Sequence, residues 1–145
     1  MNSTIIRMIP ESLYSQVLGL VLKITNASEA EDVVSYEAAF LELKELHKEL
    51  EATGLSDPFV TETLADFTED DQQAIKLYEL SISQSPAFEG EPIHTKKIAL
   101  AKRRIDLGEP IIAQDLLLQA QVEATILEDI DSIKEVNDLL AEIGG

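Results

Sequence analysis

The sequence contains no cysteine, few aromatic residues and few basic ones. The absence of cysteine excludes disulfides, thiolate metal sites and cysteine nucleophiles, and it fits a reducing compartment. Only 11 lysines and arginines stand against 28 aspartates and glutamates, so the formal net charge is −17. Such a chain repels nucleic acids and anionic membranes and favours a basic partner. The same acidity also keeps a small protein soluble, and both interpretations stay open.

Long apolar runs are also missing, because no stretch approaches the ~20 apolar residues of a membrane-spanning helix. The apolar stretch near the N-terminus recurs at helical spacing through Leu13, Val17, Leu20, Val21 and Ile24, so an amphipathic helix is expected there and not a signal peptide. With 45% hydrophobic and 27% charged residues, the chain is expected to be one globular, cytoplasmic domain over residues 1–145.

Every periodic apolar pattern in the chain is helical, and the expected fold class is all-α. Asn26–Ser28 are expected to break the first two helices, with Ser28 as an N-cap and Glu31 completing a capping box. Gly54 is a natural C-cap, and Thr68 is expected to cap the fourth helix. The seven expected helices cover about residues 10–25, 29–53, 58–67, 69–85, 93–107, 110–127 and 131–143.

The second of these helices has a heptad-like apolar seam at 3–4–3–4–3 spacing. The seam consists of Val33, Tyr36, Phe40, Leu43, His47 and Leu50. It predicts either packing within the chain or a homodimer through the 29–53 helix.

Residues 74–86 carry a small–aromatic–small pattern followed by a proline. Ala74, Tyr78 and Ser81 lie at i, i+4 and i+7 and share one helical face, while Pro86 cannot continue the helix. A second copy of the pattern contains Leu100, Ala101, Gly108, Ala113, Leu117 and Ala120. Residues 56–125 therefore resemble two tetratricopeptide repeats.

This resemblance implies stacked antiparallel helical hairpins in a right-handed superhelix of about seven helices. Residues 1–55 would form an N-terminal hairpin, 56–125 the two repeat units, and 128–145 a capping helix. Such repeats hold other proteins and seldom do chemistry. If the alignment holds, a concave, partner-binding groove is lined by Phe59, Thr63, Asp66, Phe67, Thr95, Ile98, Lys102, Ile105 and Asp106.

The sequence offers little for catalysis or metal binding. His47 and His94 are the only imidazoles, and Glu91 with His94 forms one Glu-x-x-His motif where a di-iron bundle needs two. No phosphate-binding loop, nucleophile elbow or calcium loop is present. We therefore expect no enzyme activity, no cofactor and no metal.

Two charge clusters are candidate binding features. The acidic patch of Glu69, Asp70 and Asp71 is expected to face a basic partner. Five of the 11 basic residues lie on the fifth helix: Lys96, Lys97, Lys102, Arg103 and Arg104. They either bridge to acids on adjacent helices or form a site for an acidic peptide.

Small size, acidity and a helical-repeat resemblance together favour a protein-binding role. The leading hypothesis, by analogy, is a bacterial immunity-type inhibitor that masks a basic toxin or effector. The alternative is a small tetratricopeptide-type secretion chaperone or adaptor that holds a peptide segment in its concave groove. Neither hypothesis involves nucleic acid or membrane.

Overall fold

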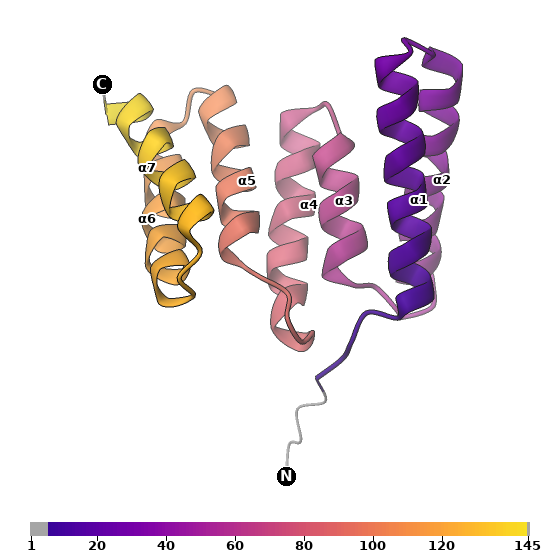
Figure 1. Cartoon of the computed structure of the whole chain (residues 1–145), viewed down its shortest axis with the longest axis horizontal. Coiled ribbons are helices and arrows are strands. Elements are labelled where there is room, and N and C mark those ends of the chain that lie inside the picture. Colours follow the sequence, from indigo (N-terminus) through magenta and orange to yellow (C-terminus); the bar gives the residue numbers. More distant parts are fainter. Residues whose placement is uncertain (1–5, 145) are drawn as a thin grey trace.

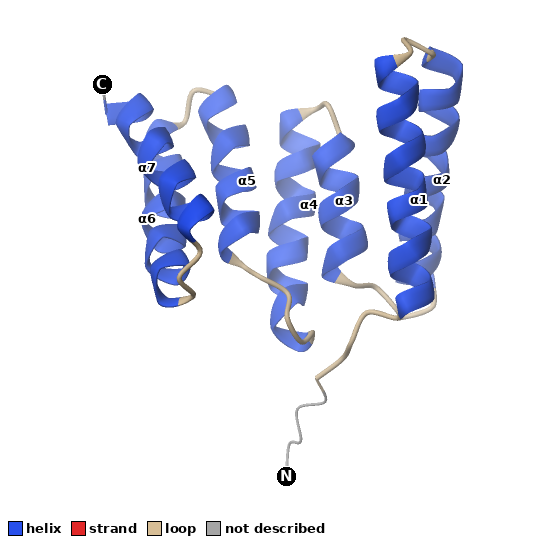
Figure 2. Ribbon diagram, viewed as in Figure 1, coloured by secondary structure: helices blue, strands red, loops and turns tan. Residues whose placement is uncertain are grey.

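The chain is built of helices joined by short loops (Figures 1 and 2). The computed structural model describes residues 6–144, and this part of the chain forms seven α-helices and one 3-10 turn, Ser85–Ala87. The helices are α1 Glu11–Glu29, α2 Val33–Ala52, α3 Pro58–Phe67, α4 Asp71–Gln84, α5 His94–Asp106, α6 Pro110–Ile126 and α7 Ile130–Gly144. The expected all-α class with about seven helices is confirmed. Within residues 6–144 the only β-type pairing is an isolated bridge between Arg7 and Phe88.

Proline and glycine mark several helix ends as their chemistry dictates. Pro58 and Pro110 occupy the first turns of α3 and α6, where a missing N–H costs nothing. Gly54 and Gly108 follow α2 and α5 with φ of +72° and +74°, the left-handed conformation that glycine adopts without strain. These signals place the hairpin turns where the sequence predicts them.

The predicted break at Asn26–Ser28 is wrong, because α1 runs through these residues to Glu29. The true N-cap of α2 is Asp32, whose carboxylate accepts hydrogen bonds from the Ser35 N–H at 3.1 Å and the Ser35 hydroxyl at 2.6 Å. Glu31 makes the turn with φ of +56°. A glutamate seldom adopts this conformation, so the sequence does not predict a turn at this position.

The predicted cap of α4 is also wrong. Asp70, not Thr68, caps this helix by accepting a hydrogen bond from the Gln73 N–H at 3.0 Å. Thr68 instead ends α3, and its hydroxyl donates to the Leu64 carbonyl at 2.7 Å. An ionised aspartate is the stronger partner for the positive end of a helix dipole.

The helices stand side by side in a row from α1 and α2 at one end to α6 and α7 at the other (Figure 1). Three buried clusters follow one another along this row. The first contains Val17, Leu20, Ile24, Ala39, Leu43, Val60 and Leu64; the second Ala65, Ala74, Ile75, Tyr78 and Leu100; the third Ile98, Ala101, Ala113, Leu117, Ala120 and Val136. Leu77 packs on the first two clusters and Leu116 on the last two, so the core is continuous.

The small–aromatic–small face of α4 is buried against α3. Ala74, Tyr78 and Ser81 are all buried, and the Ser81 hydroxyl donates to the Pro58 carbonyl at 2.8 Å. The small side chains thus let the two helix backbones approach closely, as the spacing predicts.

Most of the α2 seam packs within the chain. Leu43 and His47 are buried, while Tyr36, Phe40 and Leu50 are half-buried against the first cluster. The predicted intramolecular packing is therefore confirmed for most of the seam, while Val33 stays exposed. None of the helices in residues 6–144 combines the length and the apolar character needed to cross a membrane.

Candidate protein-binding groove

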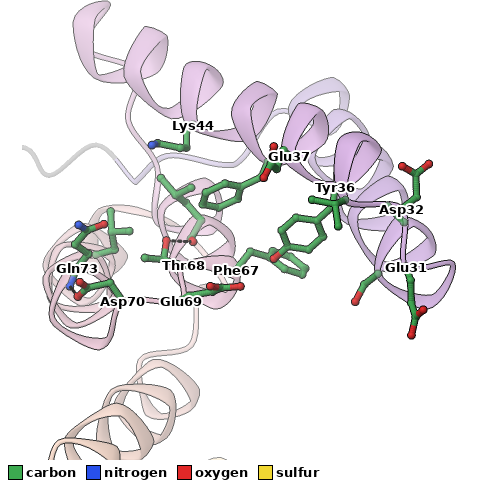
Figure 3. A pocket seen from close by; sticks show the side chains of 16 residues that line it. Glu31, Asp32, Tyr36, Glu37, Lys44, Phe67, Thr68, Glu69, Asp70 and Gln73 are labelled. Atoms are coloured by element: carbon green, nitrogen blue, oxygen red, sulfur yellow. Dashed lines mark hydrogen bonds between the residues drawn. The ribbon is translucent and has the colours of Figure 1, made fainter.

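An open groove of about 660 Å³ lies between α2 and α4 (Figure 3). Its walls come from the end of α1, the N-terminal half of α2, the end of α3, the α3–α4 loop and the first turns of α4. The lining residues are Ala27, Ser28, Glu31, Asp32, Val33, Tyr36, Glu37, Phe40, Lys44, Leu64, Phe67, Thr68, Glu69, Asp70, Gln73 and Leu77. We call this feature the α2/α4 groove.

The α2/α4 groove exists because neighbouring helices differ in length. Helix α2 has 20 residues and α3 only 10, which corresponds to about 30 Å against 15 Å. The first hairpin therefore rises beyond the second, as Figure 1 shows. The N-terminal turns of α2 have no full-length neighbour on this side, so their inward-facing side chains stay partly uncovered.

The floor of the groove is apolar and aromatic. Tyr36, Phe40, Phe67 and Leu77 are only half-buried, although each packs on the first core cluster. Tyr36 on α2 and Phe67 on α3 point toward one another across the groove (Figure 3). Rigid aromatic side chains that are already ordered make good anchors for a partner, because little conformational entropy remains to be lost on binding.

The rim of the groove is acidic. Five carboxylates line it, from Glu31, Asp32, Glu37, Glu69 and Asp70, against the single ammonium group of Lys44. The hydrogen bonds from Ser35 hold the pKa of the Asp32 carboxyl below its usual value, so this group stays ionised. The Lys44 ammonium lies 5.8 Å from the centre of the Phe40 ring.

The predicted acidic patch is divided between two roles. Glu69 and Asp70 lie on the groove rim. Asp71 forms an ion pair with Arg103 at 3.1 Å, which ties α4 to α5. The acid cluster does not predict the aromatic floor beside it, because that floor comes from α2 and the end of α3.

The residues predicted to line a concave groove are mostly used in packing. Thr63 and Ile98 are buried, and the Thr63 hydroxyl donates to the Phe59 carbonyl at 2.7 Å. Phe59 itself stacks on Tyr14 with ring centres 4.8 Å apart, and Ile105 packs on the third cluster. Thr63 and Ile98 therefore offer little free surface to a partner, while Phe59 and Ile105 are half-buried.

The remaining predicted positions keep some exposure. Asp66, Lys102 and Asp106 are exposed, and Thr95 is half-buried. The Tyr78 hydroxyl donates to Asp66 at 2.5 Å, and the Lys102 ammonium lies 3.3 Å from Glu135. Partial loss of hydration raises the pKa of the Asp66 carboxyl, while burial, together with this hydrogen bond, raises the pKa of the Tyr78 hydroxyl.

The five cations of α5 bridge to acids on neighbouring segments. The pairs are Lys96 with Glu62 and Glu91, Lys97 with Glu123, Lys102 with Glu135, Arg103 with Asp71, and Arg104 with Glu79 and Glu109. The bridging interpretation of this cluster is thus confirmed. An acidic peptide would have to displace carboxylates that are already in place.

Lys96 is the centre of the most deeply buried of these networks. Its ammonium is fully buried and lies 3.1 Å from Glu91, 3.5 Å from Glu62 and 2.7 Å from the Pro92 carbonyl, to which it donates. Burial raises the pKa of the Glu62 carboxyl, and the Lys96 charge opposes that rise. The network joins α3, α5 and the loop before α5.

The two histidines have separate carboxylate partners. His47 Nδ1 lies 3.3 Å from Glu51, and His94 Nε2 lies 2.7 Å from Asp129. Glu91 pairs with Lys96, so Glu91 and His94 are engaged with different groups. In the described part of the chain, no three histidine or acidic side chains gather closely enough to hold a metal ion.

Asp129 predicts an acid-sensitive contact at the α6–α7 turn. Hydrogen bonds from Ser132, and then the contact with His94, lower the pKa of the Asp129 carboxyl to about 2. Its stabilising effect is therefore complete above the unfolded value of 3.8 and is lost as pH falls toward about 2. In urea unfolding, we expect Asp129→Asn to have a lower free energy of unfolding than the native chain at pH 4. This difference should shrink as the pH falls from about 4 to 2.

The control for this prediction is Glu142→Gln, an exposed acid on the last helix. Its stability should follow that of the native chain across the same pH range. A difference in the free energy of unfolding between the native and Asp129→Asn proteins that does not change with pH would contradict the prediction.

A scan against protein-family models, a search of curated proteins and a search of solved structures each found no match to this chain. The groove, the ion pairs and the surface charge are thus the observations on which a function can rest.

Proposed function

We propose that this protein is a non-catalytic binding module that holds a basic segment of another protein in the α2/α4 groove. The observation that carries the proposal is the combination of a half-exposed aromatic floor with a rim of five carboxylates and one ammonium group. Apolar side chains of the segment would cover Tyr36, Phe40 and Phe67, and its lysines and arginines would face the rim. An amphipathic helix with a basic edge has this arrangement.

The floor and the rim are expected to act on different steps of binding. Burial of apolar and aromatic surface supplies most of the lasting affinity. The carboxylates act at longer range: they speed the encounter with a basic partner and make that speed fall with added salt. A net charge of −17 extends the same attraction over the rest of the surface.

The specific role that we propose is inhibition of a basic protein in the cytoplasm, in the manner of an immunity protein that masks a toxin. Small size, strong acidity and the acidic groove support this role. The chaperone alternative relies on a concave surface that includes Thr63 and Ile98, and both side chains are buried. The acidic rim of the α2/α4 groove suits a basic target, and this supports the inhibitor.

The first test uses a defined peptide probe. A helical peptide with leucines at i, i+3/i+4 and i+7 and lysines elsewhere should bind, and an isomer with scrambled leucines should bind more weakly. Tyr36→Ala should weaken binding by roughly tenfold or more, because it removes an aromatic anchor. Tyr14→Ala removes an aromatic ring from the α1–α3 contact outside the groove and should leave binding unchanged. Fluorescence anisotropy measures the binding of both peptides to the native chain and to the two variants.

The rim predicts a different signature from the floor. Glu69→Gln should lower the association rate and its salt dependence and leave the dissociation rate nearly unchanged. Equal weakening by Tyr36→Ala and Tyr14→Ala, or binding that ignores the leucine spacing, would contradict the groove as the site. Elution of the natural partner with a salt gradient, after capture from source lysate at low salt, would then identify the basic protein.

A further inference from the structure

The charges on the α2 wall of the α2/α4 groove change sign along its length. Asp32 and Glu37 lie near the start of this wall, and Lys44 is the last α2 residue that lines it. From Asp32 to Lys44 the helix rises by about 18 Å. Figure 3 shows Lys44 at one end of the groove and Asp32, with Glu31 near it, at the other. The two ends of this wall therefore suit groups of opposite charge.

Lys44 has no acidic partner in the described part of the chain. No ion pair found within residues 6–144 includes it, whereas each of the five cations on α5 has a carboxylate within 4 Å. Its side chain is exposed, and its ammonium lies beside the aromatic floor, 5.8 Å from the centre of the Phe40 ring. An acidic group of a bound segment can therefore pair with Lys44 without displacing another carboxylate.

Helix α3 indicates the direction in which a bound helix would run. It runs antiparallel to α2 and stops after 10 residues, and its end forms part of the groove (Figure 1). A helix that continues the path of α3 would pack beside the N-terminal turns of α2. The first turn of that helix carries free N–H groups and a partial positive charge, which would face the last carbonyls of α3. This direction thus brings opposite ends of two helix dipoles together.

We propose that the occupant of the α2/α4 groove is a helix of about three turns that runs antiparallel to α2, with an acidic residue in its first turn and basic residues in its last. This inference rests on the proposed function, which places a basic amphipathic segment in the groove. The acidic residue would face Lys44, and the basic residues would face Glu31 and Asp32. Acids in the first turn and bases in the last are also favoured by the dipole of the bound helix itself.

Asp70 is compatible with this arrangement. It lies on the opposite wall at the Lys44 end of the groove (Figure 3), and its carboxylate accepts a hydrogen bond from the Gln73 N–H. The partial positive charge at the first turn of the bound helix would face this carboxylate, while the acidic side chain would face Lys44. Both walls are then matched at this end.

Two peptides of identical composition test the proposal. Both carry leucines at i, i+3/i+4 and i+7, lysines elsewhere and blocked ends, and they differ only in whether a single glutamate stands in the first or the last turn. The native chain should bind the first-turn peptide roughly threefold more tightly, which is the contribution of one exposed ion pair. Lys44→Glu should lower this ratio of affinities by roughly three- to tenfold, because the first-turn glutamate then meets a like charge. Fluorescence anisotropy at low salt measures both affinities.

The control is Lys48→Glu, which makes the same charge change one turn further along α2. Lys48 is exposed and does not line the groove, so this variant should keep the native ratio. The two peptides differ in their own helicity, but that difference affects all three proteins alike and cancels in the comparison. A nitroxide on the first turn of the peptide reports the direction independently: it should broaden the NMR amide signals near Lys44 more than those near Asp32. Circular dichroism confirms that both variants remain helical.

Three results would overturn the proposal. A ratio that is the same in the native chain and in Lys44→Glu would show that the bound segment has no acidic group at Lys44. Equal changes in Lys44→Glu and Lys48→Glu would assign the effect to the net charge of α2. Stronger broadening near Asp32 would show that the helix runs parallel to α2. In all three cases weaker binding to Tyr36→Ala would still support the groove as the site, whereas full binding to Tyr36→Ala would contradict the proposed function itself.

Discussion

Replacement of Lys96 by methionine is expected to lower the free energy of unfolding by about 3–5 kcal/mol at neutral pH. Methionine fills a similar volume but removes the positive charge. The carboxylates of Glu62 and Glu91 are then left largely buried without their cation. The Pro92 carbonyl also loses its donor, which costs the desolvation of that group.

The loss of stability caused by Lys96→Met should be smaller in acid, because of the pKa of the Glu62 carboxyl. Burial already raises the pKa of its carboxyl in the folded chain, and removal of Lys96 raises it further. A raised pKa means that the folded state holds more protons than the unfolded state, so stability falls as pH rises through the folded value. The destabilisation by Lys96→Met should therefore diminish from pH 7 toward about pH 5.

Two further variants make the Lys96 prediction specific. Lys96→Met combined with Glu62→Gln and Glu91→Gln should recover much of the stability, because no charge is then left without a partner. Lys102→Met removes an exposed cation from the same helix and should cost no more than about 1 kcal/mol. Urea unfolding followed by circular dichroism measures all three. Equal losses for Lys96→Met and Lys102→Met would show that burial of the network contributes nothing.

Replacement of Leu43 by alanine is expected to cost about 2–5 kcal/mol. Leu43 is fully buried where α1, α2 and α3 meet, and the first core cluster surrounds it. The substitution removes apolar contacts and leaves a cavity that the helices can close only in part. Thermal and urea unfolding should both register the loss.

Leu41 supplies the matched control two residues away. It lies on the same helix, its side chain is exposed, and it does not line the α2/α4 groove. Leu41→Ala makes the same chemical change with the same effect on helix propensity, so it should stay within about 0.5 kcal/mol of the native chain. A comparable loss at both positions would mean that the first hairpin is not packed as described.

The sequence predicts the helices well because local chemistry sets most of their ends. Asp57 and Pro58 start α3 where expected, and Gly108 separates α5 from α6. The wrong predictions concern helix caps, at places where several nearby side chains compete to bind the first N–H groups of the helix. Ser28 and Thr68 are good caps in isolation, but Asp32 and Asp70 lie nearby and bind the helix N–H groups instead.

The candidate site was harder to predict because it depends on how hairpins meet. The acids Glu69 and Asp70 were visible in the sequence, but their neighbour Tyr36 was expected only in a packing seam or a dimer. The exposure of that ring follows from the difference in length between α2 and α3, and no motif encodes it. Ile98 illustrates the opposite case, since a position assigned to a binding surface is buried in the core.

The row-like arrangement of the helices has a consequence for how fast the protein folds. Each helix packs mainly on the ones that precede and follow it in the chain, so most contacts join residues that lie near one another in the sequence. Few long loops must close before stabilising contacts form, and proteins with this property fold within about microseconds to milliseconds. A chain that folds this quickly exposes the side chains of its three core clusters only briefly during folding, before they can attract the wrong neighbour.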